Sequence, residues 1–357
     1  MHITPDECAT RAPERRTNRS AKQTRHGRRV WLVGALAALC TALLPGVTPH
    51  ASAADEHADR HCSNTAYVTN AGDDTVSVID STTNAVTATI PVGNDPFGVA
   101  VDPPRARAYV TNTSDGTVSV INTRNNRVVG RPITVGGGPF GVAVDSPRAR
   151  AYVVNFNVGT VSVINTRNNR VIATITVGTN PEQVAVDPSR ARAYVTHPNG
   201  NNVSVIDTSN NTLLTTITVG TGPTGVAVEP STARAYVANG VDNNVSVIDI
   251  NNDANTVIAT IPVGTGPTGV AVDPSTDRAY VTNFTDNNVS VIDTSNNTEI
   301  LPRITVGDGP IRVAVDPPRD RAYVTNFNVN TVSMIDTTNN AVTPITVGNN
   351  PLGVAAF

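Results

Sequence analysis

Short apolar runs built mainly from valine, isoleucine, threonine and tyrosine recur along most of the chain, and polar turns separate them. In one unit the runs are Gly98–Asp102, Ala108–Asn112, Thr117–Asn122 and residues 128–135, the last of them interrupted by Pro132. β-Branched and aromatic residues favour strands, whereas Gly, Pro, Asn and Asp favour the turns between them. Helix-period patterns are absent from the unit, which therefore predicts four consecutive β-strands.

The same unit occurs seven times. Each copy contains the segment Ala-Tyr-Val, and the tyrosines follow one another at intervals of 42 to 44 residues, at Tyr67, Tyr109, Tyr152, Tyr194, Tyr236, Tyr280 and Tyr323. Four strands per unit at this period are typical of the blade of a β-propeller. The sequence therefore predicts an all-β fold, a seven-bladed β-propeller with four antiparallel strands per blade, over residues 65–357.

The two ends of the repeat region are out of step with each other. The first copy begins just before a second strand, at residues 66–70, and the last copy ends just after a first strand, at residues 351–357. A closed ring explains both ends, because the C-terminal strand then supplies the innermost strand of the blade whose other three come from residues 65–92. Such pairing removes an open sheet edge that would invite aggregation.

Two kinds of turn punctuate the repeats. A Val-Gly-x-x-Pro segment joins each fourth strand to the next first strand, and its glycine is expected to adopt a positive φ. These glycines are Gly93, Gly136, Gly178, Gly220, Gly264, Gly307 and Gly348. Asn-rich turns such as Asn125-Asn126 and Asn210-Asn211 are expected between third and fourth strands, because asparagine tolerates the left-handed conformation.

The segment before the repeats has a different composition. Residues 1–29 are polar and Arg-rich, residues 30–47 are mostly apolar, and Ala51-Ser52-Ala53 has the small residues of a cleavage site. This layout predicts a signal peptide at residues 1–53 and a flexible tail at residues 54–64, hence a secreted or cell-surface protein with no membrane span after cleavage. A retained membrane anchor is the alternative. Residues 28–32, Arg-Arg-Val-Trp-Leu, fit twin-arginine export, with an ordinary Sec-type basic region as the other possibility.

Charge is distributed unevenly between these two parts. The net charge of −3 combines +5 in the leader with −8 in the remaining residues. The only lysine, Lys22, and the only tryptophan, Trp31, lie in the leader, so the repeats are not those of a uniformly basic nucleic-acid binder. Two of the three cysteines also lie there, which leaves Cys62 without a partner for a disulfide after cleavage.

The repeat motifs resemble those of a known family. Pro-x-Gly-Val-Ala-Val-Asp-Pro, Ala-Tyr-Val-Thr-Asn and Thr-Val-Ser-Val-Ile-Asp are similar to the YVTN-repeat β-propeller family, with copies at Tyr67–Asn70, Tyr109–Asn112, Tyr280–Asn283 and Tyr323–Asn326. Val154, His197 and Ala238 depart from the motif. The resemblance implies a secreted or surface-associated bacterial or archaeal protein and brings no shared catalytic residues. Some members of this family are linked to DNA binding, which makes a DNA-binding propeller a minor alternative.

Breaks in the repeat on one face of the ring mark a candidate ligand site. This face, called the top, carries the loops that enter the innermost strands and surrounds the mouth of the central channel, where ligands are expected. The residues after the loop prolines are expected to ring this mouth: Phe97, Phe140, Glu182, Thr224, Thr268, Ile311 and Leu352. Gln183 and Arg312 replace glycine at the next position. They form either a pocket, in which Arg312 pairs with a ligand carboxylate, or a plug of the channel.

The sequence offers little support for catalysis. A secreted lactonase, lyase or hydrolase using Glu182, His197 and Arg312 is the alternative to a binding module, and it rests on analogy with other propellers. A lone histidine beside Pro198 is more typical of a loop residue than of a base. His57 and His61 lie in the predicted tail, so a histidine-based metal site inside the ring is not expected, and no cofactor is indicated.

The opposite face, called the bottom, has one basic sector. Ten arginines share it with four aspartates for a net charge of +6, whereas the top loops carry −7. The ten are Arg105, Arg107, Arg124, Arg127, Arg148, Arg150, Arg167, Arg170, Arg190 and Arg192. They either grip an anionic polymer such as a wall teichoic acid or DNA, or form solvated turns paired with neighbouring aspartates. We therefore predict a monomeric binding module for a protein, a cell-wall polymer or a small ligand, with nucleic acid disfavoured by the acidic top.

Overall fold

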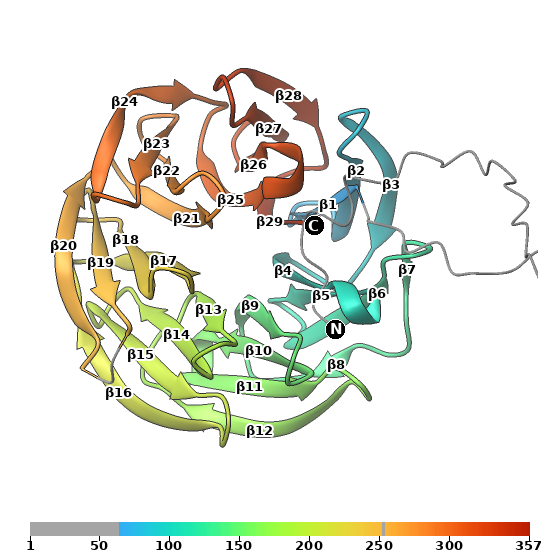
Figure 1. Cartoon of the computed structure of the whole chain (residues 1–357). Coiled ribbons are helices and arrows are strands. Elements are labelled where there is room, and N and C mark those ends of the chain that lie inside the picture. The colour runs from blue at the N-terminus through green and yellow to red at the C-terminus, as the bar shows by residue number, and fades with distance from the viewer. Residues whose placement is uncertain (1–63, 252–253) are drawn as a thin grey trace, which may run out of the picture. The chain divides into compact units, whose positions relative to one another are not determined.

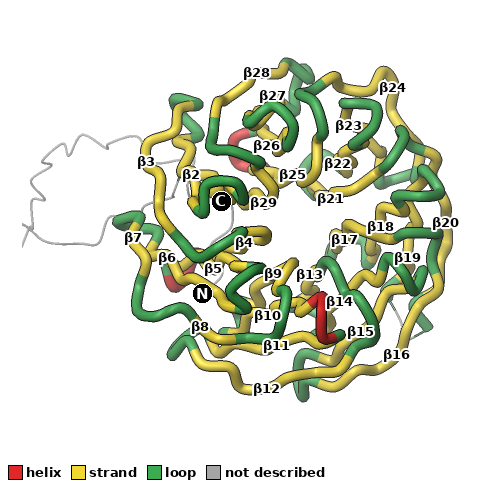
Figure 2. Tube along the Cα trace, turned by 180° about the vertical axis from the view of Figure 1, so that it is seen from behind, coloured by secondary structure: helices red, strands yellow, loops and turns green. Residues whose placement is uncertain are grey.

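Seven antiparallel sheets stand around a central axis in the computed structural model, which describes residues 64–251 and 254–357 (Figures 1 and 2). The predicted seven-bladed, all-β propeller is confirmed. The predicted signal peptide at 1–53 and all of the predicted tail except Asn64 lie outside the described residues. Within the described part, no helix is long and apolar enough to cross a membrane.

Blades are numbered here in chain order, with strands given from the axis outward. Blade 1 consists of β29 (Pro351–Ala356), β1 (Thr65–Asn70), β2 (Thr75–Asp80) and β3 (Ala85–Pro91). Blade 2 consists of β4 (Pro96–Asp102), β5 (Arg107–Asn112), β6 (Thr117–Asn122) and an outer edge split into β7 (Arg127–Val128) and β8 (Ile133–Thr134). Blade 3 consists of β9 (Pro139–Asp145), β10 (Arg150–Asn155), β11 (Thr160–Asn165) and β12 (Arg170–Thr176).

The other four blades follow the same order. Blade 4 consists of β13 (Val184–Asp187), β14 (Arg192–His197), β15 (Asn202–Asp207) and β16 (Thr212–Thr218). Blade 5 has β17 (Pro223–Glu229), β18 (Arg234–Asn239), β19 (Asn244–Asp249) and β20 (Thr256–Pro262), and blade 6 has β21 (Pro267–Asp273), β22 (Arg278–Asn283), β23 (Asn288–Asp293) and β24 (Thr298–Thr305). Blade 7 has β25 (Pro310–Asp316), β26 (Arg321–Asn326), β27 (Thr331–Asp336) and β28 (Val342–Thr346). Three short 3₁₀ turns, η1 (Pro103–Arg105), η2 (Phe156–Val158) and η3 (Pro317–Arg319), lie between strands.

The ring is closed by the two ends of the repeat region, as predicted. Strand β29 pairs antiparallel with β1, so that Tyr67 lies opposite Ala355 and Val68 lies opposite Val354. The Phe357 ring then stacks near Tyr67 with centroids 6.1 Å apart. The last strand of the chain is therefore the innermost strand of the first blade, and no blade is left with three strands.

Neighbouring blades pack through apolar clusters, each of which includes one repeat tyrosine. The tyrosine rings are fully buried. In blade 1 the Tyr67 hydroxyl donates to Asn126 Oδ1 of the next blade at 2.7 Å, and Asn126 has a φ of 53°. Tyr109 reaches Asn169 in the same way at 3.2 Å. The predicted left-handed Asn turns are confirmed, and they also tie one blade to the next.

The prediction for the loop glycines is wrong in six of seven positions. Of the Val-Gly-x-x-Pro glycines only Gly178 has a positive φ, while the left-handed residue in these loops is the one just before the proline, such as Asp95 or Gly266. The loop glycine is instead required by lack of space. A Cβ at Gly136 would lie 2.6 Å from Cγ of the motif asparagine Asn155, whose Oδ1 accepts the Gly136 N–H.

Candidate functional site

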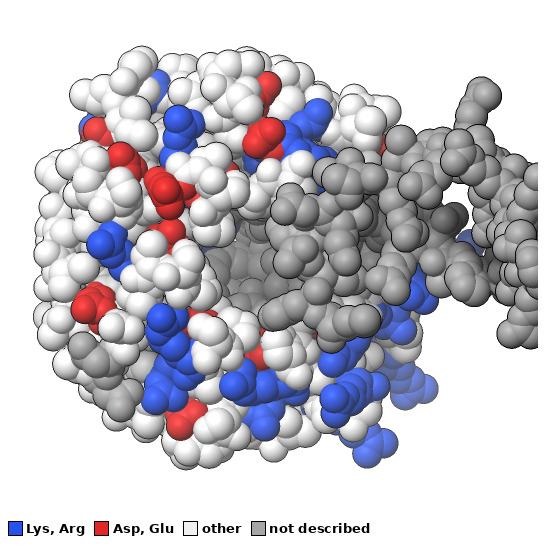
Figure 3. Space-filling view, viewed as in Figure 1, with Lys and Arg blue, Asp and Glu red and all other residues white. Residues whose placement is uncertain are grey.

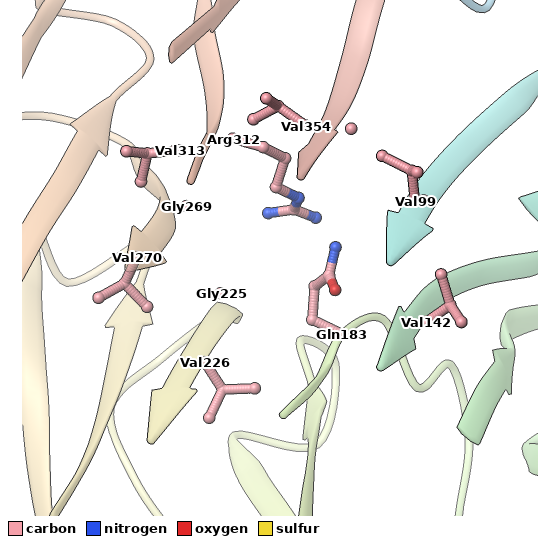
Figure 4. Close-up of a pocket in the computed structure, with 12 residues that line it drawn as sticks. Val99, Val142, Gln183, Gly225, Val226, Gly269, Val270, Arg312, Val313 and Val354 are labelled. Carbon is pink, nitrogen blue, oxygen red and sulfur yellow. The ribbon is translucent and has the colours of Figure 1, made fainter. Parts of the chain in front are cut away.

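A bridge between opposite sides of the ring crosses the top mouth. Glu182 and Gln183 precede β13 in blade 4, whereas Arg312 lies on β25 in blade 7. Arg312 Nη2 donates to Glu182 Oε1 at 2.8 Å. With the Gln183 amide turned so that its oxygen faces the guanidinium, the orientation that its surroundings favour, this oxygen accepts from Nη2 at 3.1 Å and from Nε at 2.9 Å. Figure 4 shows Arg312 and Gln183 pointing toward each other across the channel. Arg312 is only 9% exposed, so its positive charge interacts mainly with groups inside the protein.

The mouth is also held by a ring of threonine hydrogen bonds. The motif threonine of one blade donates to the carbonyl of the mouth residue in the next, as Thr69 does to Phe97 and Thr111 to Phe140, at 2.8 and 2.7 Å. Val154 and Ala238 interrupt this series. The Thr268 carbonyl, which a threonine at position 238 would reach, accepts from Thr224 Oγ1 at 3.0 Å and from Arg312 Nη1 at 2.9 Å. Arg312 therefore adds a bond at one break in the motif and also pairs with Glu182.

The remaining mouth residues pack against one another. Phe97 and Phe140 stack with ring centroids 4.4 Å apart, and Phe140 stacks on Phe156 at 4.7 Å. The Arg312 guanidinium lies over the Phe97 ring, 5.7 Å from its centroid. Phe97 and Phe140, both expected at the mouth, thus lie together there, and their role in binding a ligand stays a prediction.

Other mouth residues make hydrogen bonds between neighbouring blades. Thr224 Oγ1 donates to the Thr268 carbonyl at 3.0 Å, and Thr268 Oγ1 donates to the Ile311 carbonyl at 2.9 Å. The Leu352 carbonyl accepts from Thr325 Oγ1 at 2.8 Å. The hydroxyl groups that would serve a ligand at this mouth already hold neighbouring blades together.

The channel has two hollow regions. One, of about 150 Å³, is lined by glycines and valines of the inner strands together with Gln183 and Arg312. The other, of about 400 Å³, is lined nearer the bottom by alanine and valine side chains of the inner strands and by Phe357. Neither lining includes His197 or any carboxylate, so neither region has a nucleophile with a general base beside it.

His197 occupies the place of the motif asparagine and is 2% exposed. Its Nδ1 lies 3.1 Å from the Thr179 carbonyl and its Nε2 lies 2.9 Å from Ser204 Oγ. In the neutral ring with Nδ1–H donating to the Thr179 carbonyl, Nε2 is an acceptor, and it competes with the Val177 carbonyl, 3.0 Å away, for the single proton of the Ser204 hydroxyl. Burial lowers the pKa of His197, and the bond to Thr179 offsets this only in part. Of the three candidate catalytic residues, the structure therefore joins Glu182 with Arg312 and holds His197 in separate contacts.

Three of the ten candidate polyanion-binding arginines pair with the aspartate three residues before them. Arg105 contacts Asp102 at 3.0 Å, Arg148 contacts Asp145 at 3.2 Å, and Arg190 contacts Asp187 at 2.9 Å. Each guanidinium also donates to a backbone carbonyl of the following blade, at Ser146, Pro188 and Pro230 respectively. These three side chains therefore link neighbouring blades.

Three more of the ten bind turns of the fold, two at the start of their own second strand and one in the turn between the third and fourth strands of the next blade. Arg107 donates to the Ala106 carbonyl at 3.0 Å and Arg192 to the Ala191 carbonyl at 3.2 Å. Arg150 donates to Asn211 Oδ1 at 2.9 Å and to the Thr208 carbonyl. Their guanidinium groups serve turns of the fold.

The last four, Arg124, Arg127, Arg167 and Arg170, are different. All four are exposed on the turns between third and fourth strands of blades 2 and 3, and their side chains make no hydrogen bond or ion pair with the described residues. Figure 3 shows blue side chains gathered over this part of the ring and red ones over the opposite part. Exposed Arg131 belongs to the same region, and sequence reasoning missed it because it falls in the break between β7 and β8.

The described part of the chain contains no cluster of potential metal ligands. No group of three or more His, Cys, Asp or Glu side chains there is placed to hold an ion. The aspartates of the top loops cap backbone turns instead, since Asp115 accepts the Asn94 N–H and Asp242 accepts the Thr221 N–H. His57, His61 and Cys62 lie outside the described residues.

Fold and site together define a closed, seven-bladed repeat propeller whose channel mouth is bridged from within. Residues 29–354 match the YNCE-like beta-propeller family, and the chain belongs to it. A curated relative, the PE-PGRS family protein PE_PGRS18 of Mycobacterium tuberculosis (strain ATCC 25618 / H37Rv), is 65% identical over 37 residues. That match spans 10% of this chain and 8% of the relative.

Several solved structures share the fold. A functionally unknown protein from Desulfotomaculum acetoxidans DSM 771 has a TM-score of 0.73 at 17% identity, with 82% of this chain and 99% of that chain covered. Kuenenia stuttgartiensis hydrazine synthase has a TM-score of 0.68 at 21% identity, with 76% and 92% covered. AztD from Citrobacter koseri, in its apo form, has a TM-score of 0.61 at 15% identity, with 82% and 97% covered. At these identities the likeness concerns the fold alone.

Proposed function

We propose that the protein is an exported binding module and that its partner docks on the bottom face. The observation that carries this proposal is the contrast between the two faces. At the top mouth, Arg312 and Glu182 bind each other, whereas Arg124 and Arg167 on the bottom are exposed and make no bond with the described residues. Charged groups without internal partners are available to attract an oppositely charged ligand.

Export rests on the leader sequence. A cut after Ala53 would leave the complete ring, since its strands lie between Thr65 and Ala356. Sequencing the amino terminus of the protein recovered outside the cell tests this proposal, and we expect it to begin at Ala54. Loss of export in the Arg28→Lys, Arg29→Lys variant would identify the twin-arginine route, and full-length protein retained in the membrane would contradict the proposal.

A binding role is tested on residues 54–357, which contain the whole ring and lack the basic leader. We expect retention on a phosphate-bearing matrix that falls as salt is raised, because exposed ion pairs are screened. Retention should be unchanged in the Glu182→Gln variant, which alters the mouth. A protein that passes through phosphate-bearing and carboxylate-bearing matrices at low salt would contradict the proposal.

If the protein is instead an enzyme, the top mouth and not the bottom face would hold its substrate. A substrate there would have to displace the bond between Arg312 and Glu182, and turnover would disappear in the Glu182→Gln variant while the fold survives. Screening residues 54–357 against lactones, esters and glycosides checks this directly. We expect no turnover, and turnover that depends on Glu182 would replace the binding proposal with a catalytic one.

A further inference from the structure

The turns Asn122–Arg127 of blade 2 and Asn165–Arg170 of blade 3, here called the basic hairpins, differ from their counterparts in a coordinated way. We propose that the basic hairpins are the contact site for a linear phosphodiester polymer that carries no bases, such as a poly(glycerol phosphate). The inference rests on the proposed binding function and names the surface and the ligand chemistry. It stands on three observations, concerning turn geometry, charge and rigidity.

The first observation is that blades 2 and 3 have asparagine where other blades have aspartate, although the turn forms with either residue. In blade 4, Asp207 Oδ1 accepts the Ser209 N–H at 2.8 Å. In blades 2 and 3, Asn122 Oδ1 accepts the Arg124 N–H at 3.0 Å and Asn165 Oδ1 accepts the Arg167 N–H at 2.9 Å. The same backbone bond forms with either acceptor, so the turn does not need the negative charge; Asp207 additionally accepts from the Ser209 hydroxyl at 2.6 Å and lies 3.6 Å from Arg192.

The second observation is the size of that charge change. Each basic hairpin carries two arginines and no acid, a net +2, whereas the turn at residues 207–212 carries a single aspartate, a net −1. The equivalent turns of blades 1, 6 and 7 also begin with an aspartate, at Asp80, Asp293 and Asp336. Two adjacent blades thus lose the acid and gain a pair of arginines at the same positions.

The third observation is that the basic hairpins are held firmly by their neighbours. Asn126, beside Arg127, accepts from the buried Tyr67 hydroxyl at 2.7 Å, and Asn169, beside Arg170, accepts from Tyr109 at 3.2 Å. A side chain of each turn is therefore bonded to the preceding blade, while the arginine side chains are exposed. An anchored turn that presents exposed cations suits a repeating anion better than a single deep ligand.

The chemistry of the surface favours phosphodiesters without bases. Guanidinium groups bind phosphate oxygens through paired hydrogen bonds. Proteins that hold single-stranded nucleic acid add aromatic side chains on which bases stack. The strands that flank the basic hairpins, β6, β7, β11 and β12, contain no aromatic residue, and neither do the turns themselves. The surface can therefore bind the phosphate groups of a polymer, and it offers no aromatic side chain on which bases could stack.

Exchange of whole turns tests the inference without disturbing the fold. Asn165→Asp, Arg167→Ser and Arg170→Thr together give blade 3 the turn of blade 4, and Asn122→Asp, Arg124→Ser and Arg127→Thr do the same for blade 2. We expect each exchange to weaken binding of residues 54–357 to poly(glycerol phosphate) by roughly tenfold and to lower its salt dependence. The reverse exchange in blade 4, Asp207→Asn, Ser209→Arg and Thr212→Arg, should strengthen binding.

A matched control separates local contact from total charge. Val158→Glu, Val241→Glu and Val329→Glu add the same −3 on exposed loops of the top face, where screening over many ångströms should limit the loss to about twofold. Thermal unfolding checks that all variants fold.

Four results would overturn the inference. In the first, the turn-exchange variants bind poly(glycerol phosphate) as tightly as the control variant does. In the second, oligo(dT) binds as tightly as poly(glycerol phosphate), which would identify a nucleic-acid surface. Polygalacturonate binding as tightly would identify a carboxylate polymer instead. Lastly, phosphate-matrix retention lost only on neutralising Arg105, Arg148 and Arg190 would leave the proposed binding function standing while placing its surface elsewhere.

Discussion

Arg312 of blade 7 and Glu182 of blade 4 meet across the central channel at 2.8 Å, although 130 residues separate them in the sequence. Their side chains are 10% and 17% exposed, so the pair is largely removed from water. The cost of that desolvation is offset by the additional bonds of Arg312 to Gln183 and to the Thr268 carbonyl. The bridge therefore links opposite sides of the ring at the mouth, where a ligand site is predicted from the sequence.

Breaking this bridge from one side should destabilise the protein. Arg312→Gly restores the residue found in five other blades and leaves Glu182 without its partner, at an expected cost of about 3 kcal/mol in the free energy of unfolding. Glu182→Thr added to Arg312→Gly should recover part of that loss, because no charge then remains unpaired. Urea unfolding of both single variants and the double variant measures the coupling, and strictly additive effects would show that the pair does not stabilise the ring.

His197 should make the protein sensitive to mild acid. Burial holds its pKa below the ordinary value of 6.5. The stabilising effect of the neutral ring is therefore complete above pH 6.5, and it declines as the pH falls below 6.5 toward the folded pKa, since only the unfolded chain takes up the proton there. His197→Asn places the motif residue beside Asn202 and Ser204, as Asn239 sits beside Asn244 and Ser246.

The measurement for His197 is the free energy of unfolding between pH 7.5 and pH 5. We expect the native protein to lose stability across this window and the His197→Asn variant to stay nearly level. An equal decline in both proteins would mean that another group is responsible.

The threonine ring should contribute measurably to cohesion between blades. Thr111→Val removes the donor to the Phe140 carbonyl of the next blade and the acceptor of the Gly98 N–H, each at 2.7 Å, so we expect a loss of about 1–2 kcal/mol in the free energy of unfolding. Thr215→Val, on the exposed outer strand of blade 4, is the matched control and should change stability by less than about 0.5 kcal/mol. Equal effects at the two positions would argue that the inter-blade bond adds nothing.

Closure by the C-terminal strand should be essential to the fold. Deleting residues 351–357 removes β29, so that β1 becomes an unpaired edge and Tyr67 loses its cover. We expect aggregation or loss of the cooperative thermal transition, because open strand edges pair with other chains. Deleting Phe357 alone keeps β29 and should preserve a monomeric, cooperatively unfolding protein in sedimentation and thermal measurements.

The fold could be predicted from the sequence because every repeat contains the same pattern of four strand-forming runs. Seven evenly spaced tyrosines, the four strand-forming runs around each and the staggered ends together specify blade number and closure. The error over the loop glycines has a simple cause. Gly136 is needed because Asn155 lies against it, and such crowding between two loops is visible only in three dimensions.

The candidate site was harder to predict because an ion pair between distant blades produces no recognisable pattern in the local sequence. Glu182, Gln183 and Arg312 are breaks in the repeat that the sequence shows, but their spacing does not reveal that their side chains meet at the axis. Likewise, Arg105 and Arg124 look alike in the sequence. Only the structure separates Arg105, which pairs with Asp102, from Arg124, which is exposed with no bond to the described residues.

The central claim is that the partner is bound by the bottom face and not at the top mouth. Titration calorimetry of poly(glycerol phosphate) into residues 54–357 tests it most directly, with the Glu182→Gln variant and the combined turn exchange in blades 2 and 3 measured beside the native ring. We predict that Glu182→Gln binds like the native ring and that the turn exchange abolishes or severely weakens binding. Full binding by the turn exchange together with lost binding by Glu182→Gln would contradict the account.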